Sequence, residues 1–325
     1  MKPLFHPPVD DGAAAAPAPP DHLQIQTVTG CNGRCAFCPN GQTLRPIPPG
    51  QRMAWDLYRS VIDQCLALPV RRFSVYLMNE PLLDPELPER IAYITARRKK
   101  PQYVKIISNG SLLTERMAKG LLDAGLDKLK LSVQSLKAET YWRIMRLRLE
   151  RTLRNIDRFL ELKAQGAYPR PVLEIAMVDS PQTSGEIPET RRYWEQRGIR
   201  LSVQPMENRA DHASIRGLLS GAEHLRDFTH CRRVREQIYV LVDGRMVQCC
   251  ADWEQRSVMG DLTREKLADV WGGSRYSDCR RRIAAWQVRG MICEGCRIDR
   301  RFSLPRAQAV APSGPAATSA ETSSA

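Results

Sequence analysis

The sequence contains no run of about 18 consecutive apolar residues, which argues against a membrane-spanning helix. Residues 1–8 lack the apolar stretch that a secretory signal needs. The chain nevertheless has ten cysteines. Without an export signal, that number indicates reduced thiols or metal ligands, not a disulfide framework. We therefore expect a cytoplasmic protein with no membrane partner.

Aromatic residues are also few, at 6% of the chain, although the formal net charge is +13 from 49 basic and 36 acidic residues. Basic clusters at 97–100, 191–192 and 280–282 have no aromatics interleaved with them. Proteins that bind single-stranded RNA stack its bases on aromatic rings. We therefore expect no nucleic-acid partner, and we interpret the basic clusters as solvated faces.

The 325 residues suffice for one large α/β domain and a smaller appendage. Residues 1–20 and 304–325 are rich in Ala, Pro, Ser and Thr. Such segments cannot bury enough apolar surface to offset their ordering entropy, so we predict two disordered tails. Between the tails, the pattern divides into a large domain at 21–228 and a small one at 229–303.

In the large domain, short β-rich runs alternate with amphipathic segments. The predicted strands are 23–28, 72–78, 103–108, 128–133, 172–178 and 199–205. The predicted helices are 54–68, 87–99, 114–124, 138–164 and 186–197, with Gly125 and Gly198 at C-terminal cap positions. Six β/α repeats predict a parallel sheet curved into a partial (β/α)6 barrel, with ligands beyond the carboxyl ends of its strands.

After about residue 230 the pattern changes. Residues 238–242 and 245–249 flank Asp243-Gly244, which predicts a β-hairpin. Five cysteines lie close to this hairpin or beyond it, at positions 249, 250, 279, 293 and 296. We therefore predict a small unit held together by metal.

The first cysteine motif, C-x3-C-x2-C, follows the first predicted strand and consists of Cys31, Cys35 and Cys38. Three thiolates on one loop suit an iron–sulfur cluster, which usually takes four. An iron without a protein ligand can bind a substrate or cofactor, as a catalytic zinc does at its open position. A zinc knuckle is the alternative, but no fourth Cys or His follows within the loop.

The second cysteine set comprises Cys231, the doublet Cys249-Cys250, and Cys293 with Cys296. A Cys-x2-Cys with two upstream thiols indicates a four-ligand site. Structural zinc is the alternative, because ligand types alone do not select the metal. Cys65 and Cys279 lie in helical segments, where we expect buried packing.

Only one thiol of the doublet Cys249-Cys250 is needed as a cluster ligand. In an extended segment, adjacent side chains point to opposite faces, so the second thiol could face the active site. There its S–H could return a hydrogen atom to a substrate radical. If that hydrogen arrives on the opposite face, the carbon is inverted. A packing role for the spare thiol is the alternative.

With these motifs, residues 21–300 resemble the radical S-adenosylmethionine superfamily. The resemblance implies a four-iron cluster on Cys31, Cys35 and Cys38, with S-adenosylmethionine on the open iron. Met78-Asn79-Glu80-Pro81 resembles the family's Gly-Gly-Glu-Pro-like motif, with Asn79 in place of a glycine. The side chains implied to contact the cofactor are Phe37, Asn79, Glu80, Ser108, Asn109 and Ser132. Reductive cleavage would yield methionine and a 5′-deoxyadenosyl radical that abstracts hydrogen.

The second set resembles the shortened auxiliary-cluster module ("twitch") of the SPASM group. This implies a further four-iron cluster on Cys231, Cys250, Cys293 and Cys296. A barrel with one such module resembles enzymes of antibiotic biosynthesis, above all epimerases of the neomycin C type. That likeness implies an aminoglycoside substrate, Cys249 as hydrogen donor, and an electron donor such as flavodoxin or ferredoxin. The Gly-x4-Cys spacing from Gly244 instead favours Cys249 as ligand and Cys250 as donor, so both assignments stay open.

Three other functions compete with epimerisation: radical dehydrogenation of an amino sugar or cyclitol, maturation of a peptide, and RNA binding or metal sensing. A polycationic aminoglycoside would also require an acidic pocket in a chain that is basic overall. The acidic side chains at or near predicted strand ends or in the appended unit are Glu80, Glu174, Asp179, Glu207 and Asp252.

Overall fold

The computed structural model describes residues 17–41, 48, 50–212, 214–215, 223–225 and 231–299. Most of the two expected tails therefore lies outside the described residues. Residues 17–20 of the first tail are described, and Ala18 among them contacts α8 (Leu267–Gly272). There the carbonyl of Ala18 accepts a hydrogen bond from Trp271 Nε1 at 3.1 Å. In the described part of the chain, no helix has the length and apolarity to cross a membrane.

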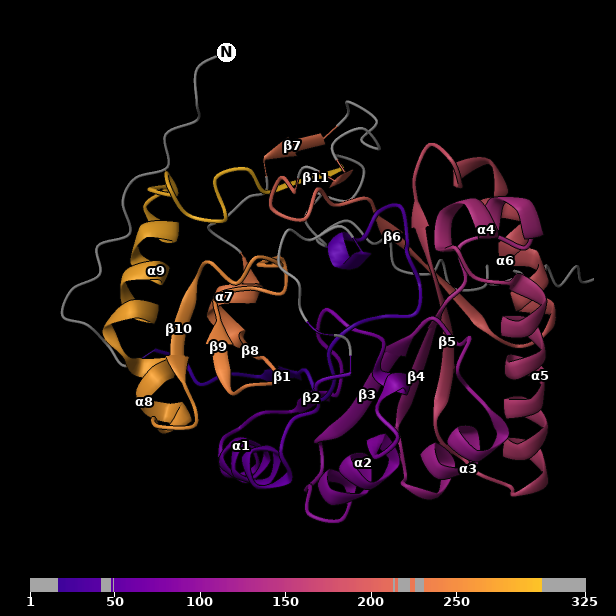
Figure 1. Cartoon of the computed structure of the whole chain (residues 1–325), viewed down its shortest axis with the longest axis horizontal. Coiled ribbons are helices and arrows are strands. Elements are labelled where there is room, and N and C mark those ends of the chain that lie inside the picture. The colour runs from indigo at the N-terminus through magenta and orange to yellow at the C-terminus, as the bar shows by residue number, and fades with distance from the viewer. Residues whose placement is uncertain are drawn as a thin grey trace, which may run out of the picture.

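Six parallel strands form the centre of the molecule, each hydrogen-bonded to the next in chain order (Figure 1). They are β1 (His22–Ile25), β2 (Arg72–Ser74), β3 (Tyr103–Ser108), β4 (Lys128–Ser132), β5 (Val172–Asp179) and β6 (Arg200–Pro205). This order, with a helix after most strands, confirms the predicted partial (β/α)6 barrel.

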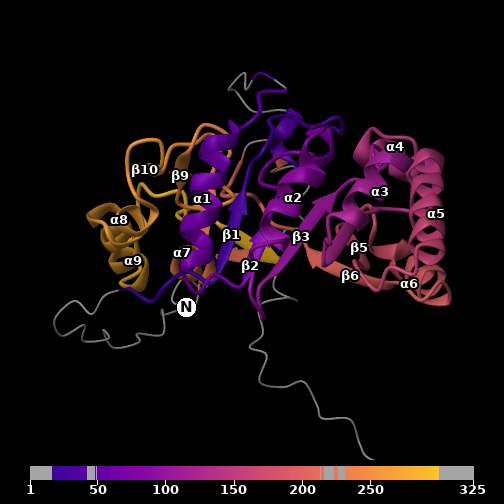
Figure 2. The same ribbon diagram turned by 90° about the horizontal axis from the view of Figure 1, so that it is seen from below.

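The helices cover one face of this curved sheet (Figures 1 and 2). They are α1 (Trp55–Ala67), α2 (Leu87–Thr95), α3 (Glu115–Asp123), α4 (Ala138–Met145), α5 (Leu149–Gln165) and α6 (Ile187–Gln196). Gly125 and Gly198 end α3 and α6 with φ of 70° and 69°, which only glycine adopts without strain.

The single helix predicted at 138–164 is wrong. The chain forms two helices there, α4 and α5, separated by Arg146 in the left-handed conformation with φ of 55°. No Pro or Gly marks the break in the sequence. The break has a tertiary cause, because the last carbonyls of α4 bind another segment, described below.

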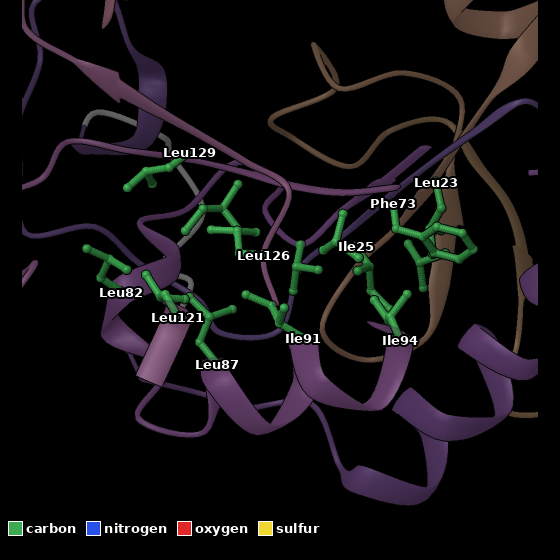
Figure 3. Packing of buried hydrophobic residues seen from close by; sticks show 14 of the residues in the cluster. Leu23, Ile25, Phe73, Leu82, Leu87, Ile91, Ile94, Leu121, Leu126 and Leu129 are labelled. Atoms are coloured by element: carbon green, nitrogen blue, oxygen red, sulfur yellow. The ribbon is translucent and has the colours of Figure 1, made fainter. Parts of the chain in front are cut away.

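The core lies between the sheet and the helices. Leu23 and Ile25 of β1 and Phe73 of β2 pack towards Ile91 and Ile94 of α2 (Figure 3). Successive side chains of a strand alternate between its two faces, so the polar residues of the same strands lie on the inner face. Burial of the apolar positions stabilises the fold by about 25 cal/mol per Å² removed from water.

The predicted hairpin forms around Asp243-Gly244, but it belongs to the barrel sheet. Strand β8 (Gln237–Val240) pairs with β1 in parallel, and β9 (Arg245–Val247) and β10 (Val258–Asp261) extend the same sheet. The remaining elements are α7 (Arg232–Glu236), α9 (Ser274–Ala284) and an antiparallel pair, β7 (Glu223–Leu225) with β11 (Arg297–Asp299). The appended unit is therefore continuous with the barrel.

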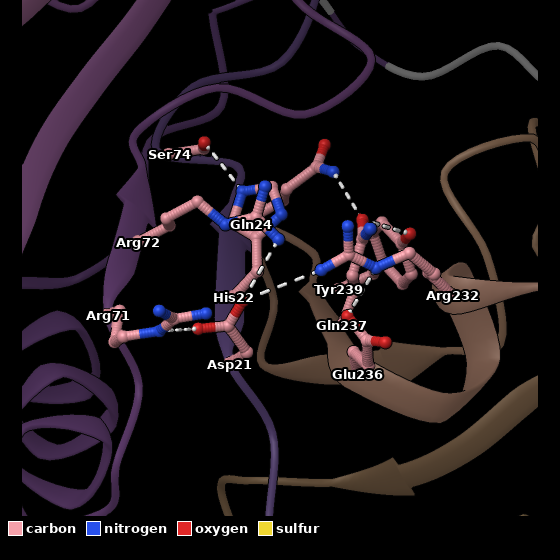
Figure 4. A network of polar contacts seen from close by, with 10 residues as sticks. All are labelled: Asp21, His22, Gln24, Arg71, Arg72, Ser74, Arg232, Glu236, Gln237 and Tyr239. Atoms are coloured by element: carbon pink, nitrogen blue, oxygen red, sulfur yellow. Dashed lines mark hydrogen bonds and ion pairs between the residues drawn. The ribbon is translucent and has the colours of Figure 1, made fainter. Parts of the chain in front are cut away.

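A polar network joins the two parts at the amino end of β1 (Figure 4). Asp21 accepts hydrogen bonds from Arg71 Nε at 2.6 Å and Arg72 Nη2 at 3.1 Å. Its carboxylate also lies 4.0 Å from Arg232 Nη2 of α7. Beside it, Gln24 of β1 donates to Gln237 of β8 at 3.3 Å.

Candidate active site and metal centres

Cys31, Cys35 and Cys38 lie half-buried on the loop that follows β1. The backbone N–H of Cys38 donates to the carbonyl of Cys35 at 3.0 Å, and the N–H of Gly33 donates to Cys31 Sγ at 3.3 Å. Burial raises the pKa of the Cys35 thiol, and the neighbouring Cys38 and Cys31 raise it further. The three thiols thus lie on one loop, close enough to affect one another's pKa.

The loop is held by the end of α4. The N–H groups of Arg34 and Ala36 donate to the carbonyls of Met145 and Ile144 at 3.1 and 2.8 Å. Helix-terminal carbonyls lack partners within their own helix, so this contact satisfies both segments. A Cβ on Gly33 would lie in contact with Leu147 Cδ1 at 3.4 Å and with the Met145 carbonyl at 3.5 Å, so the loop passes close to the end of α4 there.

Glu80 connects the loops after three strands. Its carboxylate accepts from the N–H of Leu82 at 3.0 Å, from Ser108 Oγ at 2.7 Å and from the N–H of Asn109 at 2.8 Å. Its own N–H donates to the carbonyl of Gly30 at 3.0 Å. The residue is 2% exposed, and burial raises the pKa of its carboxyl to about 7. Glu80 therefore holds the cysteine loop next to the end of β3.

Asn109 extends this contact to the cysteine motif itself. Its Nδ2 donates to Asn32 Oδ1 at 2.9 Å and lies 3.9 Å from Cys31 Sγ. Asn32 in turn donates to Ser111 Oγ at 2.7 Å. Asn32 and Ser111 are site residues that the sequence analysis missed. The only sequence signal was the position of Asn32 inside the cysteine motif.

The other residues expected to contact the cofactor lie at the same edge of the sheet. Asn79 Oδ1 accepts from the N–H of Leu77 at 2.8 Å, across Met78 with φ of 53°. Asn79 Nδ2 is buried and has no hydrogen-bond partner within the described residues. Phe37 is half-buried against the core, and Ser132 ends β4. An unpartnered amide donor beside the cysteine loop fits an acceptor group of a bound cofactor.

The five acidic side chains do not gather into one pocket. Glu174 lies 3.4 Å from Lys130 Nζ, and Glu207 accepts two hydrogen bonds from Arg233, at 2.7 and 2.8 Å. Glu80 makes the contacts described above. Asp252 accepts from backbone N–H groups within its own loop, and Asp179 accepts from Ser184. Each of the five carboxylates thus makes its contacts with a different set of neighbours.

The inner face of the barrel is basic as well as polar. Lys130 Nζ donates to Ser202 Oγ at 3.0 Å, across β5. Lys105 of β3 and Lys130 of β4 both have a lowered pKa, chiefly because burial disfavours their charged form. Glu174 partly offsets this effect for both lysines. The inner face therefore carries two half-buried lysines, on neighbouring strands.

In the appended unit, three thiols lie near Cys293: those of Cys231, Cys296 and Cys279 of α9. Burial raises the pKa of Cys293 to about 12, and Cys231, Cys279 and Cys296 add to this rise. Gln248 Nε2 donates to Cys293 Sγ at 3.0 Å. Cys279 and Cys65 are buried in the core, as expected.

The doublet lies between this unit and the barrel. The two thiols share a hydrogen bond, which with nearby Arg233 lowers the pKa of Cys250 to about 6 although burial opposes the shift. Cys250 packs, with Met78, against a small apolar cluster that includes Leu77. Cys249 is buried and close enough to Tyr276 of α9 to affect its pKa. Cys250 thus lies against the barrel-side cluster that includes Leu77, and Cys249 lies near Tyr276 of α9.

Within the described residues, no three His, Cys, Asp or Glu side chains are spaced to hold a single metal ion. A four-iron cluster takes one thiolate at each iron, so its ligands stand further apart. Three thiols on one loop and a second group of thiols around Cys293 fit two such clusters.

Family models match two parts of the chain. The model of the radical SAM superfamily matches residues 25–175, and that of the SPASM iron–sulfur cluster-binding domain matches residues 231–297. A probable GTP 3′,8-cyclase of Methanococcus maripaludis is 30% identical over 253 residues, which cover 75% of this chain and 80% of the relative. The GTP 3′,8-cyclase of Helicobacter pylori is 26% identical over 200 residues, or 61% of this chain and 60% of that enzyme. The chain thus spans about three-fifths of several such relatives.

Solved structures share the fold. BtrN in complex with AdoMet and 2-DOIA has a TM-score of 0.58 at 17% identity, covering 86% of this chain and 94% of BtrN. Streptococcus suis SuiB bound to its precursor peptide SuiA has a TM-score of 0.67 at 17% identity, covering 80% of this chain and 66% of SuiB. These comparisons do not confirm the predicted likeness to aminoglycoside epimerases. The family models and the 30% identical relative show that the chain belongs to the radical SAM superfamily and carries a SPASM iron–sulfur cluster-binding domain.

Proposed function

We propose that this enzyme inverts one carbon of an aminoglycoside, in a reaction of the neomycin C to neomycin B type. The observation that carries the proposal is the adjacent thiol pair Cys249-Cys250, of which Cys250 packs against the apolar cluster that includes Leu77 and Cys249 lies near Tyr276 of α9. An enzyme that only abstracts hydrogen needs no spare thiol at that position. An epimerase needs one to return hydrogen on the opposite face.

The residues at the strand ends would bind and orient the cofactor. Cys31, Cys35 and Cys38 would hold the cluster, and the free Asn79 amide would donate to an acceptor on the cofactor. Glu80 holds the cysteine loop against the end of β3, so it positions the cluster relative to the cofactor. When bound, cluster and cofactor together supply a carbon radical that takes a hydrogen atom from the substrate.

The thiol then completes the inversion. Its S–H bond breaks as a C–H bond forms at the substrate carbon, which leaves a sulfur-centred radical. That radical returns to the thiol by taking one electron and one proton. A low-potential donor of the flavodoxin or ferredoxin class supplies the electron, and solvent supplies the proton. The substrate gains and loses one hydrogen, so the reaction is an isomerisation.

Two assignments of the pair are compatible with this chemistry. The family likeness assigns hydrogen return to Cys249 and cluster ligation to Cys250, together with Cys231, Cys293 and Cys296. The packing of Cys250 against the small cluster that includes Leu77 favours the exchanged roles. In either case one thiol is a ligand and the other a donor, so single substitutions separate them.

The experiment compares Cys249→Ala and Cys250→Ala after anaerobic reconstitution. The donor variant should keep about eight irons and still form 5′-deoxyadenosine, but release no epimer. The ligand variant should lose about four irons. Cys35→Ala is the control and should form no 5′-deoxyadenosine. Epimer from both doublet variants would refute thiol return.

Cyclisation of GTP is a second candidate. It is favoured by the 30% identity to a probable GTP 3′,8-cyclase and by the basic inner face around Lys105 and Lys130. Neomycin C and GTP should therefore be tested in parallel in heavy water. Epimerisation predicts one deuterium at the inverted carbon, because a thiol exchanges with solvent. Conversion of GTP alone would support the cyclase. An oxidised sugar without deuterium would indicate a dehydrogenase, and turnover of a peptide alone would indicate peptide maturation.

A further inference from the structure

The side chain of Gln248 lies against the auxiliary cysteines. Gln248 is 2% exposed, and its Nε2 lies 3.0 Å from Sγ of Cys293, which is 8% exposed. Both partners are thus shielded from water. An amide N–H at this distance from a cysteine sulfur becomes a charge-assisted donor once the sulfur is a thiolate.

The backbone around Gln248 is fixed. Its N–H donates to the carbonyl of Ser257 at 3.0 Å, and the N–H of Ser257 donates to Asp252 at 2.8 Å. Cys293 lies in a turn closed by the N–H of Cys296, at 2.9 Å. The amide is therefore held in place before any ligand binds, which is how outer residues orient and tune metal ligands.

We propose that Gln248 is a positioning residue of the auxiliary cluster that sets its reduction potential through the hydrogen bond to Cys293. Reduction adds one electron, and much of the added negative charge falls on the sulfurs. A donor to sulfur therefore stabilises the reduced form more than the oxidised form, which raises the potential. This inference rests on the auxiliary cluster alone and is independent of the substrate.

The cofactor-binding cluster provides an internal reference. Asn109 Nδ2, its nearest side-chain amide, lies 3.9 Å from Cys31 Sγ and is shared with Asn32. Removal of the Gln248 amide should leave that cluster unchanged. The expected result is therefore a change in the reduction potential of one cluster and not of the other. A general loss of stability would not produce such a difference.

The test is Gln248→Met in the reconstituted full-length chain, because methionine fills similar volume without a donor. In an EPR-monitored redox titration, the reduced-to-oxidised ratio of the auxiliary cluster at a fixed potential should fall about tenfold, which is about 59 mV for one electron. The cofactor-binding cluster should not shift. Gln102→Met is the matched control, since the half-buried Gln102 amide donates to the carbonyl of Val70 at 2.9 Å, just before β3.

A second measurement covers the case in which the methionine variant loses iron. Gln248→Asn keeps an amide but is one methylene shorter, so it should lose the same hydrogen bond. Pulsed EPR after exchange into heavy water should show one fewer coupled deuteron at the auxiliary cluster in either variant. An unchanged potential and an unchanged deuteron count in a variant with about eight irons would overturn the proposal.

Discussion

At the scale of one residue, Glu80 holds two loops of the site together with a carboxylate whose burial is unfavourable when it is charged. Its carboxylate accepts three hydrogen bonds and is nevertheless buried. Burial disfavours the charged form more than the hydrogen bonds favour it, so the pKa of the carboxyl rises from 4.5 to about 7. The clamp that joins the cysteine loop to β3 therefore stabilises the fold less when Glu80 is ionised than when it is protonated.

A dependence on pH follows from this shift. Between pH 4.5 and about 7, the folded protein binds a proton at Glu80 that the unfolded chain has released. The contribution of Glu80 to stability is therefore complete below pH 4.5 and is lost as pH rises towards 7, by at most about 3 kcal/mol. Denaturant unfolding of the reconstituted protein without S-adenosylmethionine should show this loss. In Glu80→Gln the loss between pH 5.5 and 8 should be smaller, and an equal loss would contradict the shift.

At the scale of elements, α4 and the cysteine loop depend on each other. The loop satisfies the carbonyls of Ile144 and Met145, and α4 gives the loop a rigid support. At Gly33 a Cβ would already be in contact with Leu147 at 3.4 Å and with the Met145 carbonyl at 3.5 Å, so any atoms beyond a Cβ would have to find room beside the end of α4. The helical spacing of apolar residues continues from α4 into α5, so the sequence does not predict the break between them. The break is caused by a contact with the cysteine loop, more than a hundred residues away in the chain.

Gly33→Val should therefore impair the first cluster selectively. A branched side chain would push the loop off α4, and we expect iron content to fall from about eight to about four per chain after reconstitution. Gly185→Val is the control, since a Cβ there meets nothing within 4 Å. Iron assay and EPR of the auxiliary signal measure the outcome. Full iron content with normal 5′-deoxyadenosine formation would show that the close approach is not required.

At the scale of the whole molecule, one continuous sheet joins the barrel and the appended unit. Strand β1 lies between β2 and β8, and Asp21 before it contacts arginines from both sides. The hydrogen bonds and charges of Arg71 and Arg72 lower the pKa of Asp21, although burial opposes the shift. This placement fixes the thiol doublet, which follows β9, relative to the end of β2.

Asp21→Asn should weaken this junction without affecting either cluster. It leaves Arg71, Arg72 and Arg232 without their shared carboxylate, and we expect a loss of about 1 kcal/mol, as for a partly exposed ion pair. Denaturant titration at pH 7 measures the loss. Asp63→Asn is a surface control, because Asp63 contacts only the Tyr93 hydroxyl among the interactions seen here. Equal effects of the two variants would show that the junction contributes nothing specific.

The sequence by itself determined the features that depend on local spacing. Three cysteines on one loop, alternation of strand residues and glycines after helices require only neighbours along the chain, and the partial barrel follows from the repeated β/α order. The family and its two clusters follow from the same local patterns.

Only the tertiary structure decided which distant groups meet. It divided the segment at 138–164 into two helices, placed β8 beside β1, and brought Asn32, Ser111 and Gln248 to the cysteines. It also directed Cys249 and Cys250 to different neighbours. In such contacts, hydrogen-bonding groups pair with partners far away in the chain, and residue spacing does not indicate which partners these are.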